Sequence, residues 1–227
     1  ELAGRTVQLV RGIDSDYERR SALVALVEAQ PAGLFLQKEV LAAVAAMQSD
    51  YEQRTVLVAL APRLLPDPAL GGAWQAAMTR IESDFEARTV IEAMAQRDPL
   101  PAAQLDAAIQ STFPLQSDFE HAVALKALIR HLERGAPAAM TAFLKSTQRI
   151  TSNHERKTVL LALLEQSKLD KAGYAAVLQA MSGMDSDHEV GAVLVAVAAR
   201  MPADAELAAS YRRVARRLGD HERGQAE

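Results

Sequence analysis

The sequence contains no cysteine, few aromatic residues and no long apolar run. Without cysteine, neither a disulfide framework nor a thiolate metal site can form. No stretch of about 18 apolar residues occurs, so nothing in this segment predicts a membrane span. Aromatic residues are only 4% of the 227 residues. Basic residues interleaved with aromatic ones, as single-strand nucleic-acid binders use them, are missing.

Charge and motif content exclude further classes. Lysine and arginine total 25 against 29 for aspartate and glutamate, a net charge of −4. A mildly acidic chain is a poor binder of phosphate backbones, so we expect no nucleic-acid partner. Gly71 and Gly72 lack the Lys-Ser/Thr of a phosphate loop, and no nucleophile elbow occurs. We therefore expect no enzymatic activity, no cofactor and no metal.

One phrase recurs along the whole chain. It first reads I-D-S-D-Y-E-R-R-S-A-L-V-A-L, and its six copies start 34, 34, 34, 35 and 34 residues apart. A truncated seventh copy from about residue 217 contains Asp220-His221-Glu222-Arg223, and residues 1–12 resemble the end of a preceding repeat. These partial copies predict that the chain is part of a longer array of repeats. The six starts are Ile13, Met47, Ile81, Leu115, Ile150 and Met184.

Each repeat predicts two helices. Ser-x-x-Glu is a capping box, in which the hydroxyl accepts from the N3 amide and the glutamate reaches back to the cap amide. A first helix of about 14 residues should follow and end near a proline, and a second should cover, for example, 35–47 or 205–218. The serines are Ser15, Ser49, Ser83, Ser117, Ser152 and Ser186, and the glutamates are Glu18, Glu52, Glu86, Glu120, Glu155 and Glu189.

The apolar positions of the first helix predict stacking between repeats. Apolar residues occupy consecutive positions, which indicates a helix covered on more than one face. No single unit could bury this surface alone. We therefore predict an all-α protein, an α-solenoid of six 34–35-residue helix–turn–helix repeats with partial repeats at both ends, forming one domain over 1–227. An invariant alanine predicts close helix approach: Ala25, Ala59, Ala93, Ala127, Ala162 and Ala196.

Two columns of polar residues could carry chemistry but have a structural interpretation. A column of aspartates could hold calcium or do acid–base work, although helix charge and i,i+4 pairs such as Asp16–Arg20 explain it. Histidine precedes glutamate three times, yet no second histidine completes a zinc motif. Packing of a flat ring over the helix start is the structural interpretation, and a pH-sensing stack is the functional one. The residues are Asp16, Asp50, Asp84, Asp118, Asp187, His154, His188 and His221.

The repeat resembles the HEAT and tetratricopeptide class of helical solenoids. The tetratricopeptide signature is absent, and the phrase I-x-S-D-[YFH]-E more closely resembles a solenoid repeat of bacterial envelope proteins. That repeat is often attached to membrane metallopeptidases of the beta-lactam-sensing antirepressor type. The resemblance implies an extracytoplasmic (periplasmic) or accessory binding role and carries over no catalytic residue.

Several residues are candidates for partner binding. Glu92 and Lys126 interrupt an otherwise apolar row formed with Val24, Val58, Leu161 and Val195. Trp74, the only tryptophan, either packs in the core or anchors a partner. Arg212, Arg213, Arg216 and Arg217 either complement a helix end or meet an anionic partner. A second variable surface series is Arg19, Gln53, Ala87, His121, Arg156 and Val190.

These observations favour a non-enzymatic scaffold that holds a protein or peptide partner on an extended solenoid surface. One alternative is a sensor or regulatory domain of a larger membrane-anchored protein, of metallopeptidase type. Another is a HEAT-like DNA glycosylase, which the negative net charge disfavours. The oligomeric state does not follow from the sequence.

Overall fold

The structure is all helical. The computed structural model describes residues 7, 9–29, 33–133, 135 and 137–219, and these contain no strand. The predicted residues 220–223 of the seventh copy lie outside the described part. The helices are α2 (Asp16–Ala29), α3 (Leu34–Val44), α4 (Asp50–Leu60), η1 (Ala61–Arg63), η2 (Pro68–Leu70), α5 (Gly71–Met78), α6 (Asp84–Ala95), α7 (Ala102–Thr112), α8 (Asp118–Leu132), α9 (Pro137–Thr147), α10 (Asn153–Gln166), α11 (Lys171–Ala180), α12 (Asp187–Ala198) and α13 (Ala205–Ala215).

The predicted serine caps are confirmed in every repeat. Each serine hydroxyl accepts a hydrogen bond from the amide of the glutamate three residues later, at 3.3–3.4 Å. Ser49, for example, has extended backbone angles and stands directly before α4. Since each cap satisfies an amide that has no partner within the helix, it fixes where the first helix of the repeat begins.

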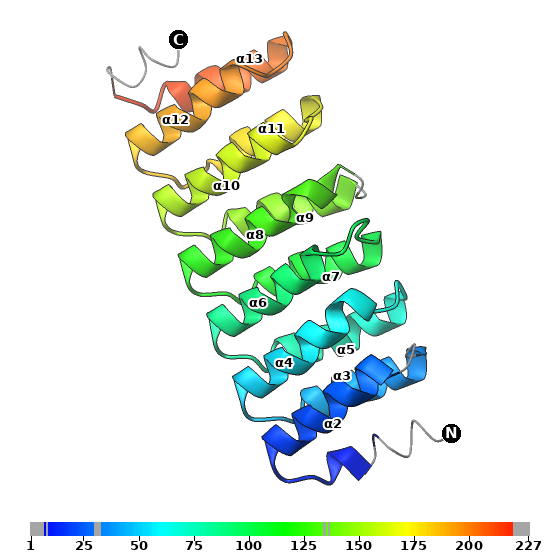
Figure 1. The fold of residues 1–227 in the computed structure, drawn as a ribbon. Helices are drawn as coiled ribbons and strands as arrows, with labels where there is room; N and C mark the ends of the chain where they lie inside the picture. Colours follow the sequence, from blue (N-terminus) through cyan, green and yellow to red (C-terminus); the bar gives the residue numbers. More distant parts are fainter. Residues whose placement is uncertain (1–6, 8, 30–32, 134, 136, 220–227) are drawn as a thin grey trace. The chain divides into compact units, whose positions relative to one another are not determined.

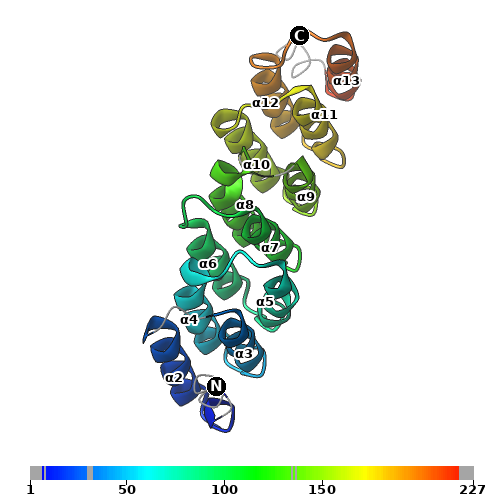
Figure 2. The same ribbon diagram turned by 90° about the vertical axis from the view of Figure 1, so that its right-hand side faces the viewer.

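The chain divides into two compact units, residues 1–116 and 117–227. In the first unit, α4 packs against both α2 and α6, and α5 packs against both α3 and α7. The helices therefore form two layers, with the first helices of the repeats on one side and the second helices on the other (Figures 1 and 2). Contacts of α3 with α4 and of α6 with α7 join the layers.

The second unit repeats this packing. Helix α10 lies between α8 and α12, and α11 lies between α9 and α13 (Figure 1). The buried residues of the first helices recur at the predicted apolar positions. Leu125, Leu160 and Leu194 have no exposed surface, like Leu57 and Ile91 in the first unit.

The invariant alanine of the first helices is not fully buried in any repeat. Ala25 is exposed and the other five alanines of this row are half-buried. Close approach of two helices at this row stays a prediction.

The recurring aspartate binds the next repeat. Asp50 Oδ2 accepts from the amides of Glu82 at 3.1 Å and Ser83 at 2.7 Å. Asp16 does the same for the amides of Gln48 and Ser49, 32 and 33 residues ahead. The cap amides of Ser49 and Ser83 are thus bound by the preceding repeat, and for these two caps the prediction that the glutamate of the same repeat binds the cap amide is wrong.

The same contact occurs in the second unit. Asp118 accepts from the amide of Thr151 at 2.9 Å, from its hydroxyl at 2.7 Å and from the amide of Ser152 at 2.7 Å. Asp187 Oδ2 accepts from the amide of Gly219 at 2.8 Å. Hydrogen bonds to an ionised acceptor are stronger than neutral ones, so this column holds consecutive repeats together.

Asp118 gives the protein a defined acid sensitivity. Burial opposes its ionisation, but the hydrogen bonds from Thr151 and Ser152 outweigh burial and lower its pKa. Its stabilising effect is therefore present above the ordinary aspartate pKa of about 3.9 and is lost as the pH falls through the lower folded value. We expect Asp118→Asn to lower the free energy of unfolding by about 1–2 kcal/mol at neutral pH.

Urea unfolding of Asp118→Asn and the parent protein at neutral pH and near pH 2 tests this expectation. The difference between the two proteins should shrink at acid pH, because Asp118 becomes protonated in the parent as well. A difference that stays constant between the two pH values would contradict the assigned contact.

The series predicted as variable surface is largely buried. Gln53 Nε2 donates to the carbonyl of Met47 at 2.7 Å, and Arg156 Nε donates to the carbonyl of Ile150 at 2.8 Å, so these two side chains bind turn atoms. His121 Nε2 is hydrogen-bonded to Ser146 Oγ of α9 at 2.7 Å. Arg19 is half-buried, and Gln53, Ala87, His121, Arg156 and Val190 are buried. The surface prediction is therefore wrong for these five buried residues.

Candidate functional site

The first helices of the first unit carry exposed aromatic rings. Tyr17, Tyr51 and Phe85 are 63%, 55% and 53% exposed, each at the second residue of its helix. Phe119 occupies the same position in the second unit and is 58% exposed. These four are among only ten aromatic residues in the chain. We call the exposed side of α2, α4 and α6 that carries the first three rings the ring face.

An arginine is stacked on each ring of the ring face. The guanidinium carbons of Arg20 and Arg54 lie 4.6 and 4.5 Å from the ring centres of Tyr17 and Tyr51. Arg88 lies 4.8 Å from the ring centre of Phe85. Such cation–π contacts hold a ring in one orientation. The spacing of three residues places ring and guanidinium on the same side of the helix.

The following repeat fixes two of these arginines. Arg20 Nε donates to Glu52 Oε2 at 2.7 Å, and Arg54 Nε donates to Glu86 Oε2 at 2.7 Å. The expected i,i+4 pairs with Asp16 and Asp50 are therefore not the ones formed. Tyr17 and Tyr51 thus each belong to a connected group of ring, arginine and glutamate of the next repeat, and both rings stay exposed.

The second unit carries a variant of this group. The side chain of Lys157 forms an ion pair with Glu189 Oε2, and His154 Nδ1 lies 3.5 Å from Glu189 Oε1. The hydrogen bond and charge of Lys157 lower the pKa of Glu189, and His154 adds a smaller effect in the same direction. Together they outweigh burial, which raises the pKa. His154 is 64% exposed, so the expected packing of this ring over the helix start is slight.

Two predicted binding residues lie on the exposed side of the first helices. Glu92 is half-buried on α6, and its Oε2 is paired with Arg88 Nη1 on the same helix. It therefore belongs to the group that holds Phe85. Lys126 is half-buried on α8 in the second unit. Partner binding by Glu92 and Lys126 stays a prediction.

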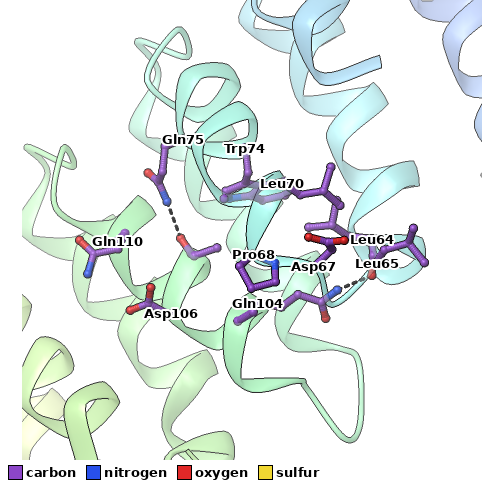
Figure 3. A pocket seen from close by; sticks show the side chains of 13 residues that line it. Leu64, Leu65, Asp67, Pro68, Leu70, Trp74, Gln75, Gln104, Asp106 and Gln110 are labelled. Atoms are coloured by element: carbon purple, nitrogen blue, oxygen red, sulfur yellow. Dashed lines mark hydrogen bonds between the residues drawn. The ribbon is translucent and has the colours of Figure 1, made fainter. Parts of the chain in front are cut away.

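Trp74 lies in the core of the first unit. It has no exposed surface, and its indole Nε1 donates to Ser111 Oγ at 3.0 Å. These contacts fit the packing interpretation. Trp74 is also among the residues that line a pocket (Figure 3).

That pocket exists because the second helix of its repeat is short. Pro62, Pro66 and Pro68 cannot donate backbone hydrogen bonds, and α5 has 8 residues where α3 and α7 have 11 each. The 3₁₀ turn η2 takes the place of the missing first helical turn. A pocket of about 370 Å³ opens between this segment, α5 and α7 (Figure 3).

The pocket has an apolar wall and an acidic edge. Leu64, Leu70, Trp74 and Ala107 are among its apolar lining residues. Its charged lining residues are Asp67 and Asp106, and no lysine or arginine lines it. Gln75 Nε2 donates to the carbonyl of Ala107 at 2.8 Å, and Gln104 Nε2 donates to the carbonyl of Leu64, so the two amides brace the wall (Figure 3).

The predicted arginine cluster lies at the end of α13. Arg212, Arg213, Arg216 and Arg217 are exposed, and Arg217 lines a smaller hollow with Asp185 and Asp187. Partner binding by this cluster stays a prediction. Among residues 7, 9–29, 33–133, 135 and 137–219, no group of three or more acidic or histidine side chains could hold a metal ion. In the same residues, no helix is both long and apolar enough to cross a membrane.

Sequence reasoning missed the ring–arginine–glutamate groups and the pocket. The signal for the groups was present, since an aromatic residue, an arginine three residues later and a glutamate 32 residues after the arginine recur with the repeat. The signal for the pocket was the proline-rich stretch after α4. Neither of these two sequence signals showed which side chains would be exposed in the folded protein.

Comparisons with protein-family models, with curated proteins and with solved structures give no significant match to this chain.

Proposed function

We propose that this protein is an α-solenoid scaffold that binds extended protein segments on its ring face. The observation that carries the proposal is the row of three exposed aromatic rings, one at the same place in each repeat of the first unit. Exposed aromatic side chains supply much of the binding energy of protein interfaces. Arginines fixed by the next repeat hold two of the rings, so little ordering is needed when a partner binds.

The spacing of the rings favours an extended partner. Packed helices lie about 8–10 Å apart, so successive rings repeat at about that distance. A polyproline II segment advances about 3.1 Å per residue and presents the same side every third residue, which is a similar repeat. We expect a partner segment with proline or apolar residues at every third position.

A peptide selection tests this proposal. Random twelve-residue peptides displayed on phage are selected on the immobilised protein, and individual binders are measured by fluorescence anisotropy. We expect period-three peptides whose affinity falls at least tenfold, about 1.4 kcal/mol, when Tyr17, Tyr51 and Phe85 are all replaced by serine. Circular dichroism establishes that the triple variant keeps its helix content.

The control is a ring on the other layer. Phe35 lies on α3 and is 65% exposed, so Phe35→Ser removes an equally accessible aromatic side chain. We expect this change to leave peptide affinity within about twofold, as for a contact outside the interface. Selected peptides that are insensitive to the triple variant, or that lose affinity with Phe35→Ser, would place the binding surface elsewhere.

A further inference from the structure

We infer that the pocket between η2, α5 and α7 binds a small organic amine, a positively charged ammonium group attached to an apolar body. The pocket lies beside the second helices of the first unit, away from the rings on α2, α4 and α6. The inference therefore does not depend on the scaffold proposal. It rests on the volume, the apolar wall and the charge of the pocket edge.

The volume and wall fit an apolar body. About 370 Å³ is within the range of small-molecule sites. The indole of Trp74 and the side chains of Leu64 and Leu70 are themselves buried, so the wall is a fixed part of the core. An aromatic or branched aliphatic group of modest size would gain burial in this volume.

The charge of the edge selects a cation. Asp67 and Asp106 both line the pocket, and no basic side chain does. Asp67 Oδ1 accepts from the amide of Ala69 at 2.8 Å, which orients this carboxylate at the start of η2. Asp106 is exposed on α7. Among the described residues, neither carboxylate forms an ion pair with a cationic side chain.

The guanidinium of Arg97 braces the wall from outside the pocket. Arg97 Nη1 donates to the carbonyl of Leu64 at 2.7 Å and to Gln104 Oε1 at 3.1 Å, and Arg97 does not line the pocket. An amine in the pocket would therefore find a carboxylate at the edge, Asp67 or Asp106, and no cationic side chain among the lining residues. A carboxylate ligand would meet repulsion there and no compensating donor of positive charge.

Trp74 reports occupancy directly, because it is the only tryptophan in the chain and lines the pocket. Phenethylamine, phenethyl alcohol and hydrocinnamate share a similar aromatic body and differ in charge. We expect saturable Trp74 fluorescence changes with phenethylamine at a dissociation constant of about 1 mM or lower. The alcohol should bind at least fivefold more weakly, and the anion more weakly still.

Three variants distinguish binding in the pocket from a general effect of the protein's net charge. Asp106→Asn should weaken phenethylamine binding about fivefold, the effect of one exposed unit charge at close range, and leave alcohol binding unchanged. Glu82→Gln makes the same change of net charge at an exposed residue outside the pocket and should have no effect. Ala103→Phe, which places a ring in the pocket, should abolish binding of both compounds.

Several results would overturn the inference. They are equal binding of alcohol and amine, equal loss with Asp106→Asn and Glu82→Gln, or no saturable signal with phenethylamine up to about 10 mM. A blocked Leu-Lys-Leu peptide that binds more tightly than phenethylamine would overturn the assignment to a small molecule, because the pocket would then suit a partner's lysine side chain. Circular dichroism of each variant separates loss of binding from loss of fold.

Discussion

Replacing Arg156 by leucine is expected to lower the free energy of unfolding by about 3–4 kcal/mol. The guanidinium is buried and donates to three backbone carbonyls, from Nε to Ile150 at 2.8 Å, from Nη2 to Gln148 at 2.8 Å and from Nη1 to Ser182 at 3.0 Å. Leucine fills part of the volume but leaves these acceptors without donors. Burying an unsatisfied polar group is among the costliest single changes.

Urea unfolding followed by circular dichroism measures this effect, and two further variants make it specific. Arg156→Lys keeps the charge but cannot reach three carbonyls at once, so it should recover less than half of the loss. Arg149→Leu removes an exposed arginine in the same unit and should change stability by no more than about 0.5 kcal/mol. Equal effects of Arg156→Leu and Arg149→Leu would show that the turn contacts contribute nothing.

Replacing Trp74 by alanine is expected to cost about 3–5 kcal/mol of unfolding free energy. The indole has no exposed surface, so its removal leaves a cavity that joins the existing pocket, and Ser111 Oγ loses one of its two donors, the other being Gln75 Nε2. The shortened α5 cannot close this space, because η2 and its prolines fix the chain on one side. The loss should appear as a lower urea midpoint by circular dichroism.

Trp74→Phe isolates part of that effect. Phenylalanine keeps most of the ring contacts and loses the hydrogen bond to Ser111, so we expect a cost of about 1–2 kcal/mol. An alanine variant that is no less stable than the phenylalanine variant would argue against a packing role. Such a result would return Trp74 to the partner-anchor interpretation.

The parts of the fold that could be predicted are those set by neighbours in sequence. Ser83 and Glu86 are three residues apart, and their capping contact depends only on local backbone geometry. The helical class follows from repeated caps and apolar periodicity in the same way. These features need no knowledge of what the next repeat contributes.

Contacts between repeats could not be assigned in this way. Asp50 at the first helical position has a sufficient local explanation in the helix dipole, and only the structure shows that it binds Glu82 and Ser83 amides instead. Arg54 likewise has an acidic residue one turn away, yet pairs with Glu86 of the next repeat. Where two acidic residues are chemically equivalent partners, the distance to each determines which one pairs with the arginine. Distances between residues of different repeats cannot be read from the sequence spacing.

The pocket illustrates a second limit. The prolines after α4 predict an interruption, but whether the resulting space is filled depends on the side chains that α7 presents. Ala103 and Ala107 are too small to fill it. The pocket therefore depends on two features together, a shortened α5 and small side chains on α7. No single sequence motif predicts this combination.

The most direct test of the scaffold account is to map where a selected peptide binds. A peptide carrying benzoylphenylalanine at one apolar position is crosslinked to the protein by light, and the modified residues are identified by mass spectrometry. The account predicts crosslinks on the exposed side of α2, α4 and α6, around Tyr17, Tyr51 and Phe85. Crosslinks confined to α3, α5 and α7 would contradict it.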